Sequence, residues 1–187
     1  MPTLRPFRDY DEKDVINLFS YSGSIPVTKG TLVKPVGDGF SPTNEPIEML
    51  GSYGDFTVNN FVAQRYGVKA KVATANSTDK PLGFLLFDVR ELDENNIPLK
   101  YNPRKAAEME AAISGQGVPI VTRGTFLYSG VVVSGGVAVT AGADAFVGDG
   151  GIITTSGVNK VGKFLGTTGV ALSGVTPSIA LVWLNCQ

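Results

Sequence analysis

Short apolar runs separated by glycine dominate the pattern of hydrophobic and polar positions along this chain of 187 residues. Residues 68–72 alternate apolar and polar side chains with a period of two, which is typical of a strand buried on one face. Residues 82–89 are apolar enough to favour a strand buried on both faces. Further β-rich runs at 15–19, 27 and 31–33 end at turn-forming residues. This pattern predicts a first half made of short strands.

The second half has the composition of a β barrel or sandwich. Gly, Val, Thr, Ser and Ala prevail from residue 120 to residue 184, and glycines separate short apolar runs. The predicted strands are 125–128, 131–133, 137–140, 145–147, 152–155, 160–165 and 179–184. Many short strands separated by tight turns are typical of a compact barrel or sandwich.

One stretch carries the signals of a helix. Asn102 precedes Pro103, which places a good N-cap residue before a proline in the first turn, and the residues up to Ile113 are rich in Ala, Glu and Met. Gly115 supplies a stop signal. We therefore predict one helix of about 103–113, within an insertion at 91–119. Residues 59–66 fit either a short helical turn or a strand.

These elements predict a mainly β fold, a small barrel or sandwich with one inserted short helix. Residues 1–14 contain two prolines and little apolar periodicity, so we expect an extended N-terminal arm, with a frayed terminus as the alternative. Residues 15–187 are then the β-rich domain. The arm up to Tyr10 is a candidate to add a strand to the sheet edge of a neighbouring molecule.

Two short motifs occur twice and raise the question of an internal repeat. The recurring segments are 29–39 with 141–150, and 80–85 with 160–165. A duplication would divide the chain into related halves at 15–90 and 120–187. Gly-rich β sequences also produce such matches by chance, so both interpretations stay open.

Charge and composition exclude several classes of partner. The 16 basic and 17 acidic residues give a net charge of −1, and no stripe of Lys or Arg is visible. Nucleic-acid binding, which requires several phosphates to be neutralised, is therefore not expected. The sequence has no apolar run as long as a membrane span, so we expect no membrane partner. A single cysteine, Cys186, excludes an internal disulfide and favours assembly in a reducing compartment.

The sequence offers no catalytic, cofactor-binding or metal-ligating candidate. Histidine is absent, which removes the commonest general base and the nucleophile pairs built on it. Asp88, Glu91, Asp93 and Glu94 form an acidic cluster, but their spacing is not that of a calcium loop. A solvated connection between strand and helix is the favoured interpretation. We therefore expect no enzyme and no cofactor.

The remaining motifs have structural interpretations. The Gly-Asp-Gly tripeptides at 37–39 and 148–150 favour hairpin turns over an anion or metal site. Ser114 and Ser134 lie beside glycines without forming the Gly-x-Ser-x-Gly turn of a nucleophile. The methionines and aromatic residues on apolar runs are predicted core residues: Met49, Met109, Phe84, Phe87, Phe126, Phe146, Phe164 and Trp183.

The most informative region is 139–156 together with 159–165. It combines Ala-Gly-Ala-Asp, a short strand, the Gly-Asp-Gly-Gly turn, Ile-Ile-Thr-Thr and then Lys-Val-Gly-Lys-Phe-Leu. This region resembles the capsid decoration (cement) proteins of tailed bacteriophages, of the lambda head-decoration type. Residues 30–39 and 81–84 look like a weaker copy of it.

The resemblance implies a β-tulip-like or small-barrel domain on the outer surface of the phage head. Such a protein is made in the host cytoplasm, bridges major capsid subunits and stabilises the shell; self-association, for example as a trimer, is a further expectation. The resemblance transfers no catalytic or binding residue. The alternative is a tail, fibre or adhesin module that binds a receptor or a glycan.

Overall fold

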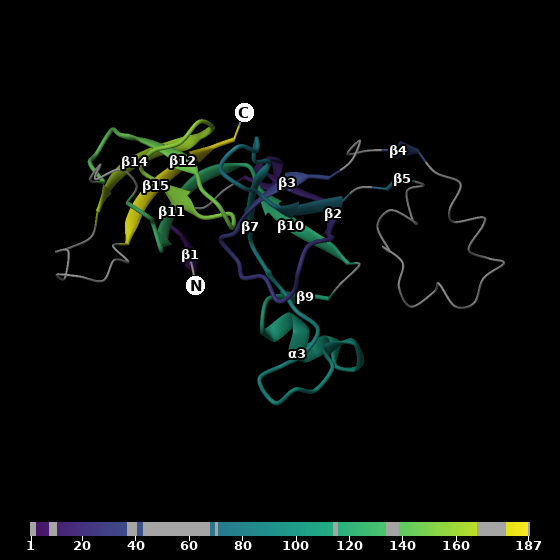
Figure 1. The fold of residues 1–187 in the computed structure, drawn as a ribbon. Helices are drawn as coiled ribbons and strands as arrows, with labels where there is room; N and C mark the ends of the chain where they lie inside the picture. Colours follow the sequence, from purple (N-terminus) through teal and green to yellow (C-terminus); the bar gives the residue numbers. More distant parts are fainter. Residues whose placement is uncertain are drawn as a thin grey trace.

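The computed structural model consists mainly of two small β assemblies that pack against each other (Figure 1). In the part of the chain that the structure describes, strands make up 48% of the residues and helices 9%, so the predicted mainly β fold with a small barrel and one short helix is confirmed for that part. The structure describes residues 3–7, 11–36, 41–42, 68–69, 71–113, 116–133, 139–167 and 179–186.

The first assembly is a closed barrel of five strands, which we call barrel 1. Its order is β10-β2-β6-β3-β7. The strands are β2 (Val15–Tyr21), β3 (Leu32–Pro35), β6 (Lys71–Thr74), β7 (Gly83–Leu85) and β10 (Gly117–Val121). Alternate side chains point inward and form the barrel core, which includes Phe19, Tyr21, Val33, Val72, Leu85, Val118 and Ile120.

The second assembly is a six-stranded sheet with the order β1-β11-β15-β14-β12-β13. Its strands are β1 (Thr3–Pro6), β11 (Arg123–Ser129), β12 (Asp144–Val147), β13 (Ile153–Thr154), β14 (Lys160–Thr167) and β15 (Ala180–Asn185). A parallel bridge joins Val132, just beyond β11, to Thr154 in β13. The sheet formed by β11 to β15 therefore curls so that the chain just beyond β11 meets β13 at its far edge, and we call this curled sheet barrel 2.

The two barrels have the same connectivity. In each, the first strand pairs with the fifth, the second with the third and fourth, and the fourth with the fifth, all antiparallel. The first strand meets the third in parallel orientation in barrel 1, and in barrel 2 Val132, three residues beyond the first strand, makes the corresponding parallel bridge. Individual hydrogen bonds also match: Gly30 N–H donates to Leu85 O at 2.7 Å, and Gly142 N–H donates to Phe164 O at 2.7 Å. Both glycines have a φ of +87°, which favours glycine.

The register sets which positions of the two barrels correspond. Across β3, β7 and β10, Leu32, Phe84 and Val121 lie side by side. Across β12, β14 and β15, the corresponding row is Asp144, Lys163 and Trp183. Because β10 completes barrel 1, the two barrels span 15–121 and 123–185, whereas the division considered from sequence lay at 15–90 and 120–187.

A shared core joins the barrels. Phe84 leaves the outer surface of barrel 1 and stacks on Tyr128, with the ring centroids 5.4 Å apart, and it meets Phe126 edge-on at 6.3 Å. Backbone bonds support this contact, because Leu32 N–H donates to Gly151 O at 2.7 Å and Gly151 N–H donates to Ala75 O at 2.8 Å. The row of Leu32, Phe84 and Val121 is completely buried by this packing.

The N-terminal segment differs from the expected free arm. Thr3–Pro6 forms β1, which runs antiparallel to β11 of the same chain. Leu4 is only 4% exposed and belongs to the core shared by the barrels. A short 3₁₀ helix, η1 (Glu12–Asp14), then leads into β2. The extended conformation was predictable, but the segment pairs with β11 of its own chain instead of with a neighbouring molecule.

Two predicted elements are shorter than expected. The helix α3 spans Pro103–Glu108, not 103–113, because Glu110 adopts a φ of +48° and Ala111–Ala112 forms β9 instead. β9 pairs in parallel with β8 (Asp88–Val89), and both alanines are buried there. The single strand predicted over 82–89 is accordingly divided into β7 and β8 by a bend at Leu86 and Phe87.

In the second half, 131–133 forms only the bridge at Val132, and Val139 and Thr140 are not in a strand. Residues 37–39, 59–66 and 137–138 lie outside the described part, while Ser41–Pro42 (β4) and Val68–Lys69 (β5) pair with each other.

Candidate interaction surface on the insertion

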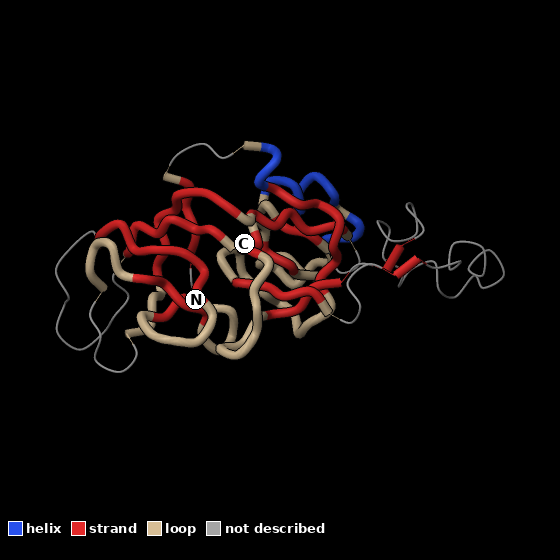
Figure 2. Tube along the Cα trace, turned by 90° about the horizontal axis from the view of Figure 1, so that it is seen from above, coloured by secondary structure: helices blue, strands red, loops and turns tan. Residues whose placement is uncertain are grey.

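A long connection between the fourth and fifth strands distinguishes barrel 1. Residues 86–116, 31 in number, separate β7 from β10, whereas 12 residues, 168–179, separate β14 from β15. We call residues 86–113 the insertion. It projects from barrel 1 (Figure 1), and the view from above places its helical residues on one side of the molecule (Figure 2).

Asp93 holds the insertion together. Its side chain is buried, and Oδ1 accepts hydrogen bonds from the backbone N–H groups of Asn95 (2.7 Å) and Ile97 (2.8 Å). Oδ2 forms an ion pair with Lys105 Nζ at 2.7 Å. These donors, with Lys105 the strongest, hold the pKa of Asp93 below its usual value. A carboxylate expected to be solvated is therefore the structural centre of the insertion.

The rest of the predicted acidic cluster is dispersed. Asp88 Oδ1 accepts the backbone N–H of Lys29 at 2.7 Å, which fixes the base of the insertion to barrel 1. Glu94 approaches Lys105 at 3.3 Å, and Glu91 is exposed. In the part of the chain that the structure describes, no three His, Cys, Asp or Glu side chains are placed to hold a metal ion.

A small apolar core lies beneath these polar groups. Leu99, Ala106 and Ala111 are buried together, with Met109 and Ile113 packed against them. The predicted start of the helix is confirmed, since Asn102 Oδ1 accepts the N–H of Lys105 at 3.3 Å and Pro103 occupies the first turn. The 3₁₀ turn η4 (Leu99–Tyr101) precedes it. The insertion is thus a fixed structure rather than a loose loop.

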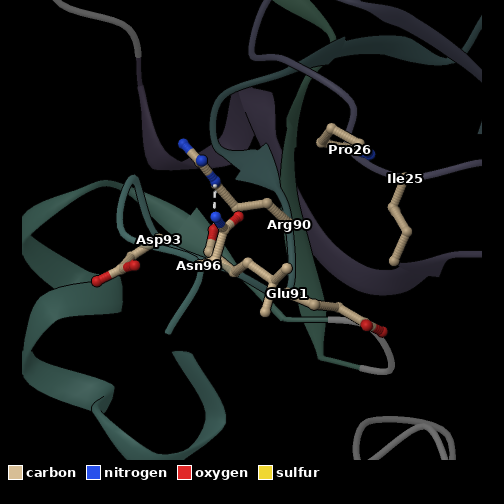
Figure 3. Close-up of a pocket in the computed structure, with 7 residues that line it drawn as sticks. Ile25, Pro26, Arg90, Glu91, Asp93 and Asn96 are labelled. Atoms are coloured by element: carbon tan, nitrogen blue, oxygen red, sulfur yellow. Dashed lines mark hydrogen bonds between the residues drawn. The ribbon is translucent and has the colours of Figure 1, made fainter. Parts of the chain in front are cut away.

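A pocket of about 300 Å³ lies at the base of the insertion (Figure 3). Its lining residues are Ile25, Pro26, Arg90, Glu91, Leu92, Asp93 and Asn96. Ile25 and Pro26 lie across the opening from Arg90 and Asn96 (Figure 3). Arg90 Nε donates to Leu92 O at 2.9 Å, which fixes the guanidinium stem against the wall.

Several large apolar side chains of the insertion face solvent. Tyr101 is 77% exposed and Ile97 is 53% exposed, and Leu92 at the pocket is also exposed. Phe87, a predicted core residue, is 37% exposed, because the bend that ends β7 turns it outward. Contiguous exposed apolar patches mark interaction sites in many proteins, so the exposed apolar residues of this element make it a candidate interaction surface. Sequence patterns missed this surface, since its apolar residues follow neither a strand nor a helix period.

The Gly-Asp-Gly turn at 148–150 is confirmed as a hairpin turn between β12 and β13. Asp149 Oδ1 accepts the N–H and the hydroxyl of Ser77, at 3.0 and 2.7 Å, so this turn also attaches barrel 2 to barrel 1. The Ser77 bonds lower the pKa of Asp149. The second tripeptide, 37–39, and the serines Ser114 and Ser134 lie outside the described residues.

The other predicted core residues divide into two groups. Phe84, Phe126 and Phe164 are fully buried, while Phe146, Trp183 and Met109 are only partly buried. Met49 lies outside the described residues. Cys186 is partly buried, and burial raises the pKa of its thiol to about 12, so the thiolate needed for nucleophilic chemistry is scarce at neutral pH.

No family model, no curated protein and no solved structure matches this chain. Among the helices that the structure describes, none has the length and apolar character to cross a membrane.

Proposed function

We propose that this chain is a non-enzymatic structural protein of a virion, a capsid decoration protein that binds the outer surface of a tailed-phage head. The observation that carries the proposal is the insertion, an ordered element whose apolar side chains face solvent beside a pocket. Such a surface is suited to binding another protein rather than to chemistry. The resemblance of residues 139–165 to head-decoration proteins supports the same function.

The insertion is the proposed contact with the major capsid protein. Asp93, its ion pair with Lys105 and the small core around Leu99 hold the exposed side chains in fixed positions, so little conformational entropy is lost on binding. The pocket between Ile25 and Leu92 can accept one apolar side chain of a shell subunit. Several such contacts on one shell, linked by self-association, strengthen binding by raising the effective concentration.

A tail, fibre or adhesin module that binds a glycan is the second candidate. Tyr101 favours it, because its ring is 77% exposed, with the Lys100 ammonium 4.9 Å from the ring centroid. Glycan recognition uses such exposed aromatic rings. Two results together would favour this candidate: the parent chain binds a glycan but not shells, and the variant Tyr101→Ala loses the glycan binding.

The decisive experiment is sedimentation of the chain with undecorated shells and with free capsid subunits, followed by thermal rupture of the particles. We expect the chain to pellet with intact shells, to bind free subunits weakly and to raise the rupture temperature, because a ligand of the intact shell stabilises it. Leu92→Asp should abolish pelleting. Val158→Asp is the matched control, since Val158 is 81% exposed on barrel 2. Equal binding to free subunits and shells would refute the proposal.

A further inference from the structure

The outer face of barrel 2 carries an apolar cluster that its strand register makes continuous. Leu127 on β11 lies opposite Leu181 on β15, and Trp183 follows two residues later on the same face. Leu165 on β14 is 46% exposed and immediately precedes Gly166, which lies opposite Leu181. The inward positions of these strands, such as Phe126 and Val182, form the barrel core instead.

Basic side chains surround this cluster. They are Arg5, Arg123 and Lys163, which lie opposite Leu127, Asn185 and Trp183 respectively. All three are exposed, and none forms an ion pair with a carboxylate among the described residues. The acidic residue on this face, Asp144, is already paired with Lys160 at 2.6 Å. Among the described residues, this face therefore carries more positive than negative charge, although the whole chain has a net charge of −1.

The corresponding face of barrel 1 is already buried by a contact within the chain, against barrel 2. Its row of Leu32, Phe84 and Val121 is completely buried against barrel 2. The row at the same positions of barrel 2 is Asp144, Lys163 and Trp183. Of the two equivalent faces, the one on barrel 1 is therefore used for packing within the chain. The charged residues of barrel 2 exclude a repeat of the same apolar contact and require a partner of different chemistry.

We propose that this face, which we call the basic–apolar face (Arg5, Arg123, Leu127, Lys163, Leu181 and Trp183), docks onto a protein surface with an apolar centre and a rim of carboxylates. Trp and Arg are the residues that contribute most to protein interfaces, and the guanidinium groups match carboxylates in geometry. The central leucines favour a protein over a nucleic acid, whose phosphate backbone offers them no apolar partner. This inference rests on the proposed function, in which the partner is the capsid shell. The shell is then contacted by two surfaces of the chain, the insertion and the basic–apolar face.

Trp183 is the single tryptophan of the chain, so it reports directly on this face. The full chain is labelled with 5-hydroxytryptophan, which can be excited apart from the tryptophans of a shell. Quenching by acrylamide is then measured free, with undecorated shells and with duplex DNA. We expect shells to lower the quenching constant at least threefold and duplex DNA to leave it unchanged.

A charge reversal tests the basic rim. The triple variant Arg5→Glu, Arg123→Glu and Lys163→Glu should weaken sedimentation with shells at least tenfold. The control variant Lys13→Glu, Lys71→Glu and Lys80→Glu changes the net charge equally at exposed positions of barrel 1 and should bind like the parent. Thermal melting verifies that both variants fold.

The outcomes separate this proposal from the proposed function. A chain that pellets with shells while the quenching constant of Trp183 stays at its free value, or a triple variant that binds like its control, overturns the basic–apolar face and leaves the decoration function standing. Failure of the parent chain to pellet with shells overturns the decoration function itself. Protection of Trp183 by DNA replaces the protein partner with a nucleic acid and also overturns the proposal.

Discussion

Barrel 1 and barrel 2 share one connectivity but differ in what they add to it. Barrel 1 carries the 31-residue connection that contains the insertion, and it buries one outer face against its neighbour. Barrel 2 has only 12 residues, 168–179, at that connection, leaves the corresponding face only partly buried and accepts β1 as an additional strand. The difference shows that the strand frame sets the positions of the surfaces, while the side chains and connections decide what each surface binds.

The two first strands explain why only barrel 2 holds an extra strand. β11 pairs with β15 residue for residue, so its other edge is regular and β1 pairs along it. β2 shifts register opposite Pro119, which has no N–H to donate, and Asn17 and Leu18 form the irregularity. A bulge of this kind twists an edge and discourages pairing.

Loss of the Phe84 aromatic ring, which packs between the two barrels, should have the largest effect on stability. Phe84→Ala removes a completely buried side chain and should lower the free energy of unfolding by about 3–5 kcal/mol. Phe87→Ala, three residues further along the chain and 37% exposed, should cost less than about 1 kcal/mol. Urea denaturation measures both. Equal costs would contradict the shared core.

Removing the side chain that attaches β1 should have the next largest effect. Leu4→Ala should lower the free energy of unfolding by about 2–3 kcal/mol, because Leu4 is buried in the core of barrel 2. Hydrogen exchange should then quicken in β11 more than in β2. Phe7→Ala, which is exposed, is the control. Unchanged exchange in β11 would mean that β1 is dispensable.

Acid should weaken the insertion, the ion pair of Lys34 with Asp79 (2.8 Å) in barrel 1, and the junction between the barrels. The pKa values of Asp93, Asp79 and Asp149 lie below the usual carboxyl value of 3.8, because each accepts hydrogen bonds, from Lys105, Lys34 and Ser77 respectively. At acidic pH the unfolded chain therefore binds more protons than the folded chain. The stabilisation is complete above pH 3.8 and is lost as the pH falls further, through the lowered values.

Thermal melting between pH 6 and pH 2 measures this loss. Asp93→Asn should reduce the acid-dependent change in melting temperature, and Glu91→Gln, at an exposed site of the same insertion, should leave it intact. A melting temperature that is independent of pH below 3.8 in the parent chain would contradict the assignment.

The smallest effect tests the equivalence of the barrels. Gly30→Ala and Gly142→Ala each place a side chain at a φ of +87°, and each should cost about 1–2 kcal/mol. The two glycines make the same hydrogen bond to the fourth strand, but Gly30 is buried whereas Gly142 is exposed with open space around an added Cβ, so Gly30→Ala should cost at least as much as Gly142→Ala. Urea denaturation measures both, and a clearly larger cost for Gly142→Ala would contradict the equivalence of the two backbone positions.

Local chemistry explains which elements were predictable from sequence. The hairpin at 148–150 and the helix start at Asn102 depend on residues a few positions apart, and both were predicted. The end of α3 was not, because Ala111–Ala112 pairs with β8, a contact between distant segments. The boundary of the first repeat was missed for the same reason, since the insertion separates β10 from β7.

The candidate surfaces were less predictable than the fold. Asp93 looked solvated because its partner Lys105 lies 12 residues away, on a helix whose position depends on the fold. Trp183 lies on an alternating strand, and the period of two shows that alternate residues share a face without showing which face is inward. Only the register with β11 and β14 identifies it as an outer-face residue.

The position of β15 determines when the molecule can be completed during synthesis. β15 lies between β11 and β14, so barrel 2 cannot close before residue 185 has left the ribosome. Barrel 1 has all its strands by residue 121 and can fold while translation continues. β1 is synthesised first but cannot pair until β11 has been made, more than a hundred residues later. A chain that ends before residue 123 therefore presents barrel 1 with the apolar row of Leu32, Phe84 and Val121 uncovered, and exposed apolar surface of this kind makes incomplete chains prone to aggregate.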